Sequence, residues 1–160
     1  MIDFTKPTEH QKWLAINDNV MGGISIGRLT YDGESSQFQG ELSLVNNGGF
    51  SSIKRSLEPL PKEVNTVELV VVGDGRSYQL RLTMWKDGSP IHYKHEFSTI
   101  KGKPQKKVFN LQDFQAVFRG RLLSEAPELV ADEIKQVGFL IADKQTQPFT
   151  LNLVQIQFTT

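Results

Sequence analysis

The chain has 160 residues, and its 18 lysine and arginine residues balance 18 aspartate and glutamate residues, so the formal net charge is zero. Without a basic excess, a protein is not expected to bind nucleic acid through the phosphate backbone. The absence of cysteine excludes disulfide frameworks, zinc knuckles and thiol catalysis. This length predicts a single domain over residues 1–160.

Strands are predicted along most of the chain, because polar and apolar residues alternate with a period of two. The first two predicted strands cover Ile24–Asp32 and Ser35–Val45. Val64–Val72 is rich in β-branched residues and nearly continuously apolar, so we expect a strand that is buried on both faces. Tyr78–Met84 and Ile91–Phe97 alternate regularly and predict half-buried strands.

Two further strands are predicted later in the chain, over Gln136–Ala142 and Phe149–Phe158. In the last of these, the apolar phase changes after Leu153, which predicts a β-bulge. Helical signals are weak, and short helices are expected only at Leu111–Phe114 and within Pro127–Lys135.

Glycine-rich turns separate the predicted strands. Gly73-Asp74-Gly75 predicts a tight turn that closes Val64–Val72 against the next strand, and Asp87-Gly88-Ser89-Pro90 predicts the turn that follows. Short strands with a turn about every ten residues predict an all-β fold, an antiparallel β-sandwich or barrel. The side chains expected in its core are Phe38, Leu42, Leu44, Leu69, Val71, Leu80, Leu82, Phe139, Ile141, Leu151 and Leu153.

No pattern in the sequence predicts catalysis. Gly23-Ile24-Ser25-Ile26-Gly27 matches the serine elbow of hydrolases, but Ser25 begins a predicted strand, whereas an elbow serine follows one. His92 and His95 are three residues apart, which on a strand places them on opposite faces and not around one metal ion. We therefore expect no enzymatic activity, no histidine-based metal site and no cofactor.

The arginine residues carry a more informative pattern. Arg76 follows the turn at Gly73–Gly75, Phe118-Arg119-Gly120-Arg121 places two more in a predicted loop, and Arg55 and Arg81 occupy the polar faces of their strands. The planar guanidinium group suits carboxylates, phosphates and sugar hydroxyls. These arginines either pair with acidic side chains and fasten loops to the sandwich, or leave a donor fork available to a ligand.

The glycine-rich turns lie next to strand ends, and a sandwich gathers its loops at its two ends. We expect one polar cluster on such a surface, with a tryptophan packed against it. Its predicted members are Trp13, Asp18, Asn47, Arg76, Tyr78 and Arg119. As a structural lock, the cluster pairs Asp18 with Arg76 or Arg119. As a recognition site, one arginine accepts a sugar, a carboxylate or an acidic side chain of a partner.

Five motifs follow one another in order along the chain. They are Trp13 with Asn17-Asp18-Asn19-Val20-Met21-Gly22-Gly23-Ile24-Ser25 and Phe38-Gln39-Gly40, then Asn46-Asn47-Gly48-Gly49-Phe50-Ser51-Ser52, then Gly73-Asp74-Gly75-Arg76-Ser77-Tyr78, then Phe114 with Phe118-Arg119-Gly120-Arg121, and last Gly138-Phe139-Leu140-Ile141-Ala142-Asp143-Lys144-Gln145 with Pro148-Phe149. Together this series, which extends to about Ile156, resembles the complex I intermediate-associated protein family. Asn17 and Gln147 depart from the pattern, which more often has an acidic residue and a glycine there.

The resemblance implies a jelly-roll sandwich of the galactose-binding-like type, in agreement with the period-two alternation. It also implies a non-catalytic interaction module that binds a protein partner, because mitochondrial members are assembly factors for respiratory NADH:ubiquinone oxidoreductase. A carbohydrate or small-ligand binding module with a polar cleft is the alternative. The sequence contains no signal-peptide, transit-peptide or transmembrane pattern, so we expect a bare-domain bacterial member located in the cytoplasm.

Overall fold

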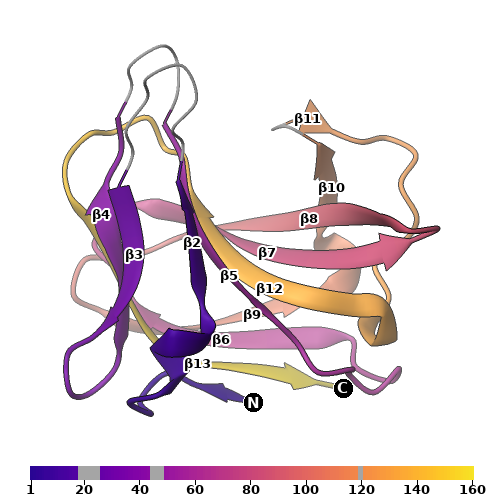
Figure 1. Cartoon of the computed structure of the whole chain (residues 1–160), viewed down its shortest axis with the longest axis horizontal. Coiled ribbons are helices and arrows are strands. Elements are labelled where there is room, and N and C mark those ends of the chain that lie inside the picture. Colours follow the sequence, from indigo (N-terminus) through magenta and orange to yellow (C-terminus); the bar gives the residue numbers. More distant parts are fainter. Residues whose placement is uncertain (18–25, 44–48, 119–120) are drawn as a thin grey trace.

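Two antiparallel β-sheets packed face to face make up the structure, a computed structural model that describes residues 1–17, 26–43, 49–118 and 121–160 (Figure 1). The first sheet has six strands in the order β3-β4-β13-β6-β9, and β1 pairs with β13 outside this path. Its strands are β1 (Ile2–Asp3), β3 (Ile26–Tyr31), β4 (Ser36–Glu41), β6 (Thr66–Val72), β9 (Pro104–Asn110) and β13 (Phe149–Thr159).

The second sheet has seven strands in the order β11-β10-β8-β7-β12-β5-β2. Its strands are β2 (Leu14–Asn17), β5 (Ser51–Ser56), β7 (Ser77–Lys86), β8 (Ser89–Ser98), β10 (Gln115–Phe118), β11 (Arg121–Leu122) and β12 (Ile134–Ile141). Single 3₁₀ turns lie between strands at η1 (Glu9–Lys12), η4 (Leu111–Asp113) and η5 (Ala131–Glu133).

The core lies between the two sheets and is built by the alternation that the sequence displays. In β7, Leu80 and Leu82 are fully buried, whereas Gln79 and Arg81 lie on the outer face. Every predicted core residue within the described ranges is buried, and Leu44 lies outside those ranges. The predicted all-β fold is confirmed as an antiparallel β-sandwich of the jelly-roll type.

Two predictions of local structure are wrong. Gly73–Gly75 does not close a hairpin, because β6 and β7 belong to different sheets and the turn carries the chain from one to the other. The strand predicted at Val64–Val72 is not buried on both faces, since Val70 and Val72 on the outer side of β6 are half-exposed. The apolar character of that side reflects the fit of valine to a pleated surface and not a covering layer.

Two other predictions of local structure are confirmed. Asp87 and Gly88 join β7 to β8 with φ angles of 54° and 80°, which matches the two positive φ values of a type I′ hairpin turn. The register between β13 and β6 shifts between Leu153 and Gln155, where the change of apolar phase predicted a bulge.

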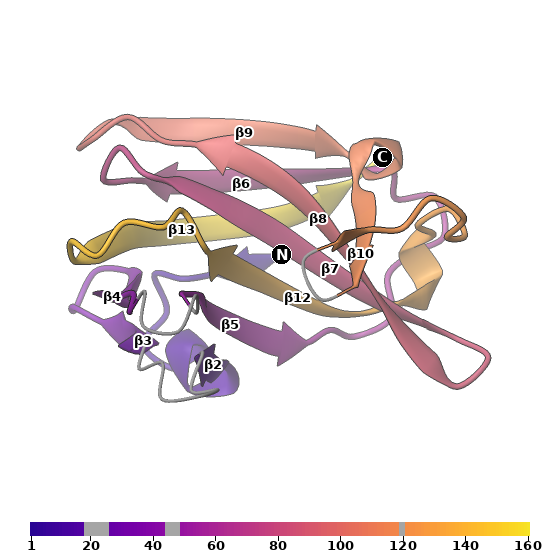
Figure 2. The same cartoon turned by 90° about the horizontal axis from the view of Figure 1, so that it is seen from above.

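The seven-stranded sheet is strongly curved. In Figure 1, β2 and β5 rise on one side of its outer face and β10 and β11 rise on the other, and Figure 2 looks down onto β12, β7 and β8 between them. Both chain ends belong to the six-stranded sheet, through β1 and β13. Among the described residues, no helix has the length and apolar character needed to cross a membrane.

Candidate functional site

A groove of about 680 Å³ lies on the outer face of the seven-stranded sheet. Its floor consists of outward-facing residues of β5, β12, β7 and β8, which alternate along each strand with core residues, and its sides are formed by β2 and β10. The polar side chains that line it are Ser52, Lys54, Gln79, Arg81, Thr83, His92, Lys94 and Gln136. Among the described residues that line this groove, none is acidic.

Three cations cross the floor of the groove in one row. Lys54 of β5, Gly138 of β12, Arg81 of β7 and Lys94 of β8 are paired in register across four adjacent strands. We term Lys54, Arg81 and Lys94 the basic row. With neighbouring strands about 4.8 Å apart, the row extends over roughly 14 Å. Like charges opposite each other on paired strands destabilise a sheet, so the pairing of Arg81 with Lys94 does not serve folding.

The basic row is poorly neutralised by the protein itself. Arg81 donates from Nη1 to the neutral Gln79 side chain at 2.9 Å, and no described carboxylate forms an ion pair with Arg81 or Lys54. Lys94, whose side chain is 18% exposed, pairs at 2.8 Å with Glu96, whose side chain is 65% exposed, so solvent on the Glu96 side screens part of this attraction. Burial lowers the pKa of Arg81, because its charge is partly removed from water.

His92 lies beside the basic row. Its Nδ1 is 2.9 Å from the hydroxyl of Thr83. Burial lowers the pKa of His92, and the charges of Arg81 and Lys54 lower it further. The predicted separation of the two histidines on β8 is confirmed, since the His95 ring packs on the other face against the Phe109 ring with centroids 4.6 Å apart.

The lowered pKa of His92 predicts that the protein loses stability in mild acid. As pH falls below the ordinary histidine pKa of about 6.5, the unfolded chain takes up a proton at this position that the folded chain does not, so the free energy of unfolding decreases. His92→Gln should remove this contribution. Urea unfolding at about pH 7 and about pH 5 should therefore differ less for the variant than for the wild type. An identical pH dependence in both proteins would contradict the assignment.

Apolar side chains form the two sides of the groove. On β2, Leu14 pairs in register with Lys54, and Leu14 and Ile16 are 60% and 37% exposed. On the opposite side, Val117 of β10 lines the groove and pairs with Leu122 of β11, which is 59% exposed. The groove therefore combines a cationic floor with apolar walls.

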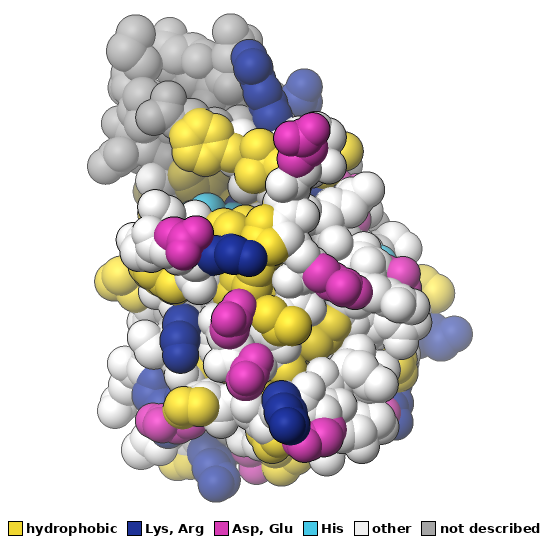
Figure 3. Space-filling view, turned by 90° about the vertical axis from the view of Figure 1, so that its right-hand side faces the viewer, with side chains coloured by type: hydrophobic (Ala, Val, Ile, Leu, Met, Phe, Trp, Pro, Cys, Tyr) yellow, Lys and Arg dark blue, Asp and Glu magenta, His cyan; other side chains and the backbone are white. Residues whose placement is uncertain are grey.

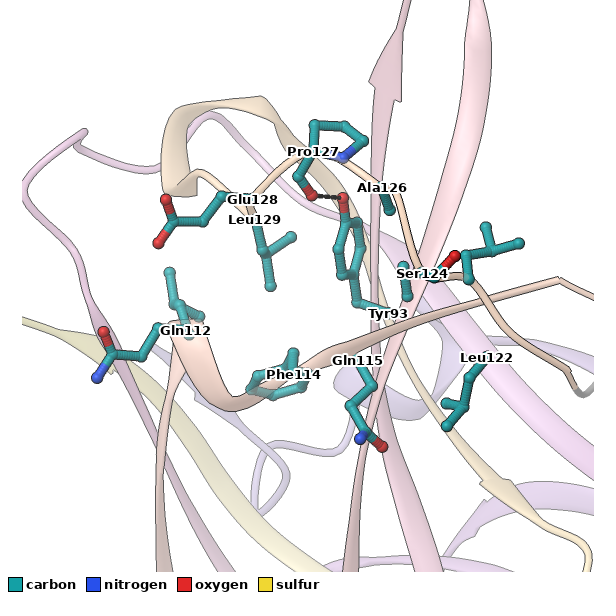
Figure 4. A pocket seen from close by; sticks show the side chains of 13 residues that line it. Tyr93, Gln112, Phe114, Gln115, Leu122, Ser124, Ala126, Pro127, Glu128 and Leu129 are labelled. Carbon is teal, nitrogen blue, oxygen red and sulfur yellow. Dashed lines mark hydrogen bonds between the residues drawn. The ribbon is translucent and has the colours of Figure 1, made fainter.

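A smaller hollow of about 430 Å³ opens at the side of the sandwich near β10. Figure 4 shows Phe114, Leu129 and Tyr93 around it, and the Tyr93 hydroxyl donates a hydrogen bond to the carbonyl oxygen of Pro127. Burial raises the pKa of Tyr93, so the phenol remains a protonated donor. Figure 3 views this side of the molecule and shows hydrophobic side chains gathered across its middle. The Tyr93 bond holds the segment before η5 against β8.

Arg76, predicted to belong to a polar cluster, is a buried and fully engaged ion-pair residue. Its Nε and Nη2 donate to the two carboxylate oxygens of Asp143 at 2.7 and 2.6 Å. Nη2 also donates to the carbonyl oxygen of Gln145 at 2.8 Å, and Nη1 to that of Gln147. The side chain is 8% exposed, and four of the roughly five N–H groups of a guanidinium are thereby used. This geometry is that of a lock between the turn before β7 and the loop that joins β12 to β13.

Tyr78, a second predicted member of the cluster, lies on the same network. Its hydroxyl donates to both carboxylate oxygens of Asp74 at 3.0 Å. The same carboxylate accepts a hydrogen bond from the backbone N–H of Thr150 at 2.8 Å and from that of Arg76 at 3.1 Å. Burial raises the pKa of Tyr78, and the neighbouring Asp74 raises it further. The network joins the turn before β7 to β13 of the other sheet.

Trp13 lies apart from this network, next to the core. Its ring centroid is 5.4 Å from that of Phe4 and 6.0 Å from that of Phe139, and its Nε1 donates to Glu9 at 3.0 Å. The other predicted residues, Asp18, Asn47 and Arg119, lie outside the described residues, as does Ser25.

The groove residues were not predicted as a group. The alternation in β7 and β8 predicts that Arg81, His92 and Lys94 lie on the polar faces of their strands. Their meeting with Lys54 depends on β12 and β5 lying next to β7, an order that the local pattern does not contain.

Comparison with known proteins decides the family. The sequence profile described as Complex I intermediate-associated protein 30 (CIA30) matches residues 2–153. The chain belongs to the CIA30 family. It is 26% identical to the mouse mitochondrial complex I intermediate-associated protein 30, over 94% of this chain and 52% of that protein, so it spans about half of the mouse relative's length. It is 29% identical to an uncharacterised Schizosaccharomyces pombe protein, over 82% of this chain and 68% of that protein.

Solved structures similar to this CIA30 chain include carbohydrate-binding modules and parts of agarases. A family 11 carbohydrate-binding module from Clostridium thermocellum, in complex with a β-1,3-1,4-mixed-linked tetrasaccharide, superposes with a TM-score of 0.67 at 10% identity, over 92% of this chain and 88% of the module. Part of an exo-β-agarase superposes with a TM-score of 0.56 at 10% identity, over 100% of this chain and 25% of the agarase. At these identities the likeness concerns the fold alone.

Proposed function

We propose that this CIA30 chain is a non-catalytic binding module that holds a segment of a protein partner in the groove of the seven-stranded sheet, as an assembly factor of respiratory NADH:ubiquinone oxidoreductase. Family membership over residues 2–153 supports the assembly role. The proposal keeps the cytoplasmic location expected from the sequence.

The observation that carries the proposal is the make-up of the groove walls. Ile16 lines the groove on one side, next to the exposed Leu14 of the same strand. On the other side Val117 lines it, and its partner on β11, Leu122, is exposed and also lines the smaller hollow. Exposed apolar side chains that lie close together mark interaction surfaces, where they bury against apolar groups of a partner. Among the described residues that line the groove, Phe50 is the one aromatic side chain that is partly exposed, so the walls present mainly aliphatic side chains to a ligand.

A charge placed on the wall tests this function. We expect Ile16→Asp to abolish the capture of NADH:ubiquinone oxidoreductase subunits from the native host, because an aspartate at the interface must be desolvated without a partner. The measurement is affinity capture with the tagged full chain, followed by mass spectrometry of the captured subunits.

The matched control is Ile100→Asp, which introduces the same charge at an exposed isoleucine in the β8–β9 turn. Thermal unfolding of both variants checks that they fold. Equal capture of the subunits by wild type and Ile16→Asp would contradict the groove as the binding site, and no capture by the wild type would contradict the assembly role.

Carbohydrate binding is the second candidate, and one residue favours it. Trp85 follows Arg81 and Thr83 in the alternation of β7, so it lies on the groove side of that strand, and it is 38% exposed. An exposed indole at the end of a groove offers a stacking surface for a sugar ring. Titration with the β-1,3-1,4-mixed-linked tetrasaccharide tests this function: a change in tryptophan fluorescence in the wild type that is lost in Trp85→Ala would support it, and the absence of any change would exclude this ligand.

A further inference from the structure

We propose that the basic row binds carboxylates, so that the segment held in the groove is an acidic peptide. This inference rests on the proposed function and names the chemistry of the partner. Lys54, Arg81 and Lys94 supply three positive charges within one groove, and no acidic residue lines the groove in the described part of the chain. The whole chain, by contrast, is electrically balanced.

The first step of the argument is the unused donor capacity of Arg81. Within the described parts of the chain its guanidinium makes one hydrogen bond, from Nη1 to Gln79, whereas a guanidinium has about five N–H donors. A planar fork of this kind binds a carboxylate through two parallel hydrogen bonds, which are about twice as strong as neutral ones. Arg76 illustrates the same chemistry inside this protein, where its fork is occupied by Asp143.

The second step is the repulsion that the row contains. Arg81 and Lys94 are directly opposite each other on paired strands, and burial together with the positive charges of Arg81 and Lys54 lowers the pKa of His92. The ion pair of Lys94 with Glu96 offsets part of this repulsion, and the remainder is unfavourable in the free protein. A bound anion removes the repulsion, so its binding gains from an interaction that the unliganded sheet lacks.

The third step is access. Gly138 lies between Lys54 and Arg81 and has no side chain, so the centre of the row is open to the groove. The row spans roughly 14 Å, and an extended peptide advances about 3.3 Å per residue, so a segment of about five residues reaches all three cations.

The apolar walls select a peptide over other anions. Ile16 and Val117 line the groove on its two sides. The exposed Leu14 and Leu122 extend these sides, since Leu14 is on the same strand as Ile16 and Leu122 pairs with Val117. A peptide can place apolar side chains against these walls while its carboxylates meet the floor. Phosphate and uronic-acid saccharides carry the charge but have no apolar side chains to bury there.

The test compares two soluble synthetic peptides of the same length, one with three glutamates among leucine and serine and one with glutamine in their place. Binding to the full chain is followed by calorimetry and by the backbone amide resonances of the basic row. We expect the glutamate peptide to bind and shift the Arg81 and Gly138 resonances, and the glutamine peptide not to bind. Arg81→Gln and Lys54→Gln should each weaken binding about tenfold or more, and Arg28→Gln on β3 of the other sheet should leave it unchanged.

Several outcomes would overturn the inference. Equal binding of both peptides would mean that carboxylates are not recognised, and unchanged affinity in Arg81→Gln would mean that the basic row does not recognise them. Binding of oligogalacturonate at the row without binding of the glutamate peptide would assign the row to acidic saccharides. Binding of inorganic phosphate alone would assign it to free anions.

Failure of this inference is distinguishable from failure of the proposed function. If Ile16→Asp loses the captured subunits and Arg81→Gln retains them, the groove binds the partner without using its carboxylates. If the glutamate peptide binds the row but no subunit depends on Ile16, the anion site stands and the assembly function does not.

Discussion

Replacing Arg76 by alanine should lower the free energy of unfolding by about 3–5 kcal/mol, because it leaves a largely buried carboxylate without its partner. The Asp143 side chain is 12% exposed and receives two hydrogen bonds from the guanidinium. The carbonyl oxygens of Gln145 and Gln147 lose their donors as well. Urea unfolding of wild type and variant, monitored by circular dichroism, measures the difference.

Two controls make this result specific. Asp143→Asn should destabilise the protein. The double variant that also carries Arg76→Ala should lose less free energy of unfolding than the sum of the two single losses, since the two residues form one network. Arg81→Gln, on the groove floor, should change the free energy of unfolding by no more than about 0.5 kcal/mol or increase it, because it relieves the repulsion by Lys94. Equal destabilisation by Arg76→Ala and Arg81→Gln would contradict the division between lock and binding site.

Leu82→Ala should destabilise the protein by about 2–5 kcal/mol through lost apolar burial and the cavity left behind. Leu82 has no exposed surface and lies in the middle of β7, opposite Tyr93 on β8 and Val137 on β12. At about 2–4 °C per kcal/mol for a protein of this size, the midpoint of thermal unfolding should fall by roughly 4–20 °C.

Leu122→Ala provides the matched comparison, because it removes the same atoms from an exposed position on β11. Its effect on the free energy of unfolding should stay within about 0.5 kcal/mol. If Leu82→Ala lowers the free energy of unfolding only slightly, the centre of the seven-stranded sheet rearranges around the cavity. In that case β7 is not the rigid floor on which the groove depends.

The parts of the fold that the sequence predicts are those encoded by neighbouring residues. The alternation in β7 places Leu80 and Leu82 inward and Arg81 outward, since successive side chains on a strand point to opposite faces. The Asp87-Gly88 turn is likewise a local signal, because few residues adopt two consecutive positive φ angles.

The parts that the sequence did not predict depend on distant segments. The turn at Gly73–Gly75 resembles a hairpin turn, and nothing within it indicates that β7 joins the other sheet. The partner of Arg76 lies 67 residues away in sequence, so the choice of Asp143 among 18 acidic residues requires the strand order. The basic row requires the same information, because its members come from β5, β7 and β8.

Gly138 limits which residues of the groove can be substituted to change its ligand preference. A Cβ atom at this position would lie 2.5 Å from the carbonyl oxygen of Ile53 and 3.3 Å from the Cβ of Lys54. Any larger residue would therefore push β12 away from β5 as well as fill the groove. Relatives or engineered variants that acquire a new ligand preference are expected to change Leu14, Ile16 and Leu122 while keeping the glycine. A library aimed at new specificity should randomise those three positions and leave the centre of the floor untouched.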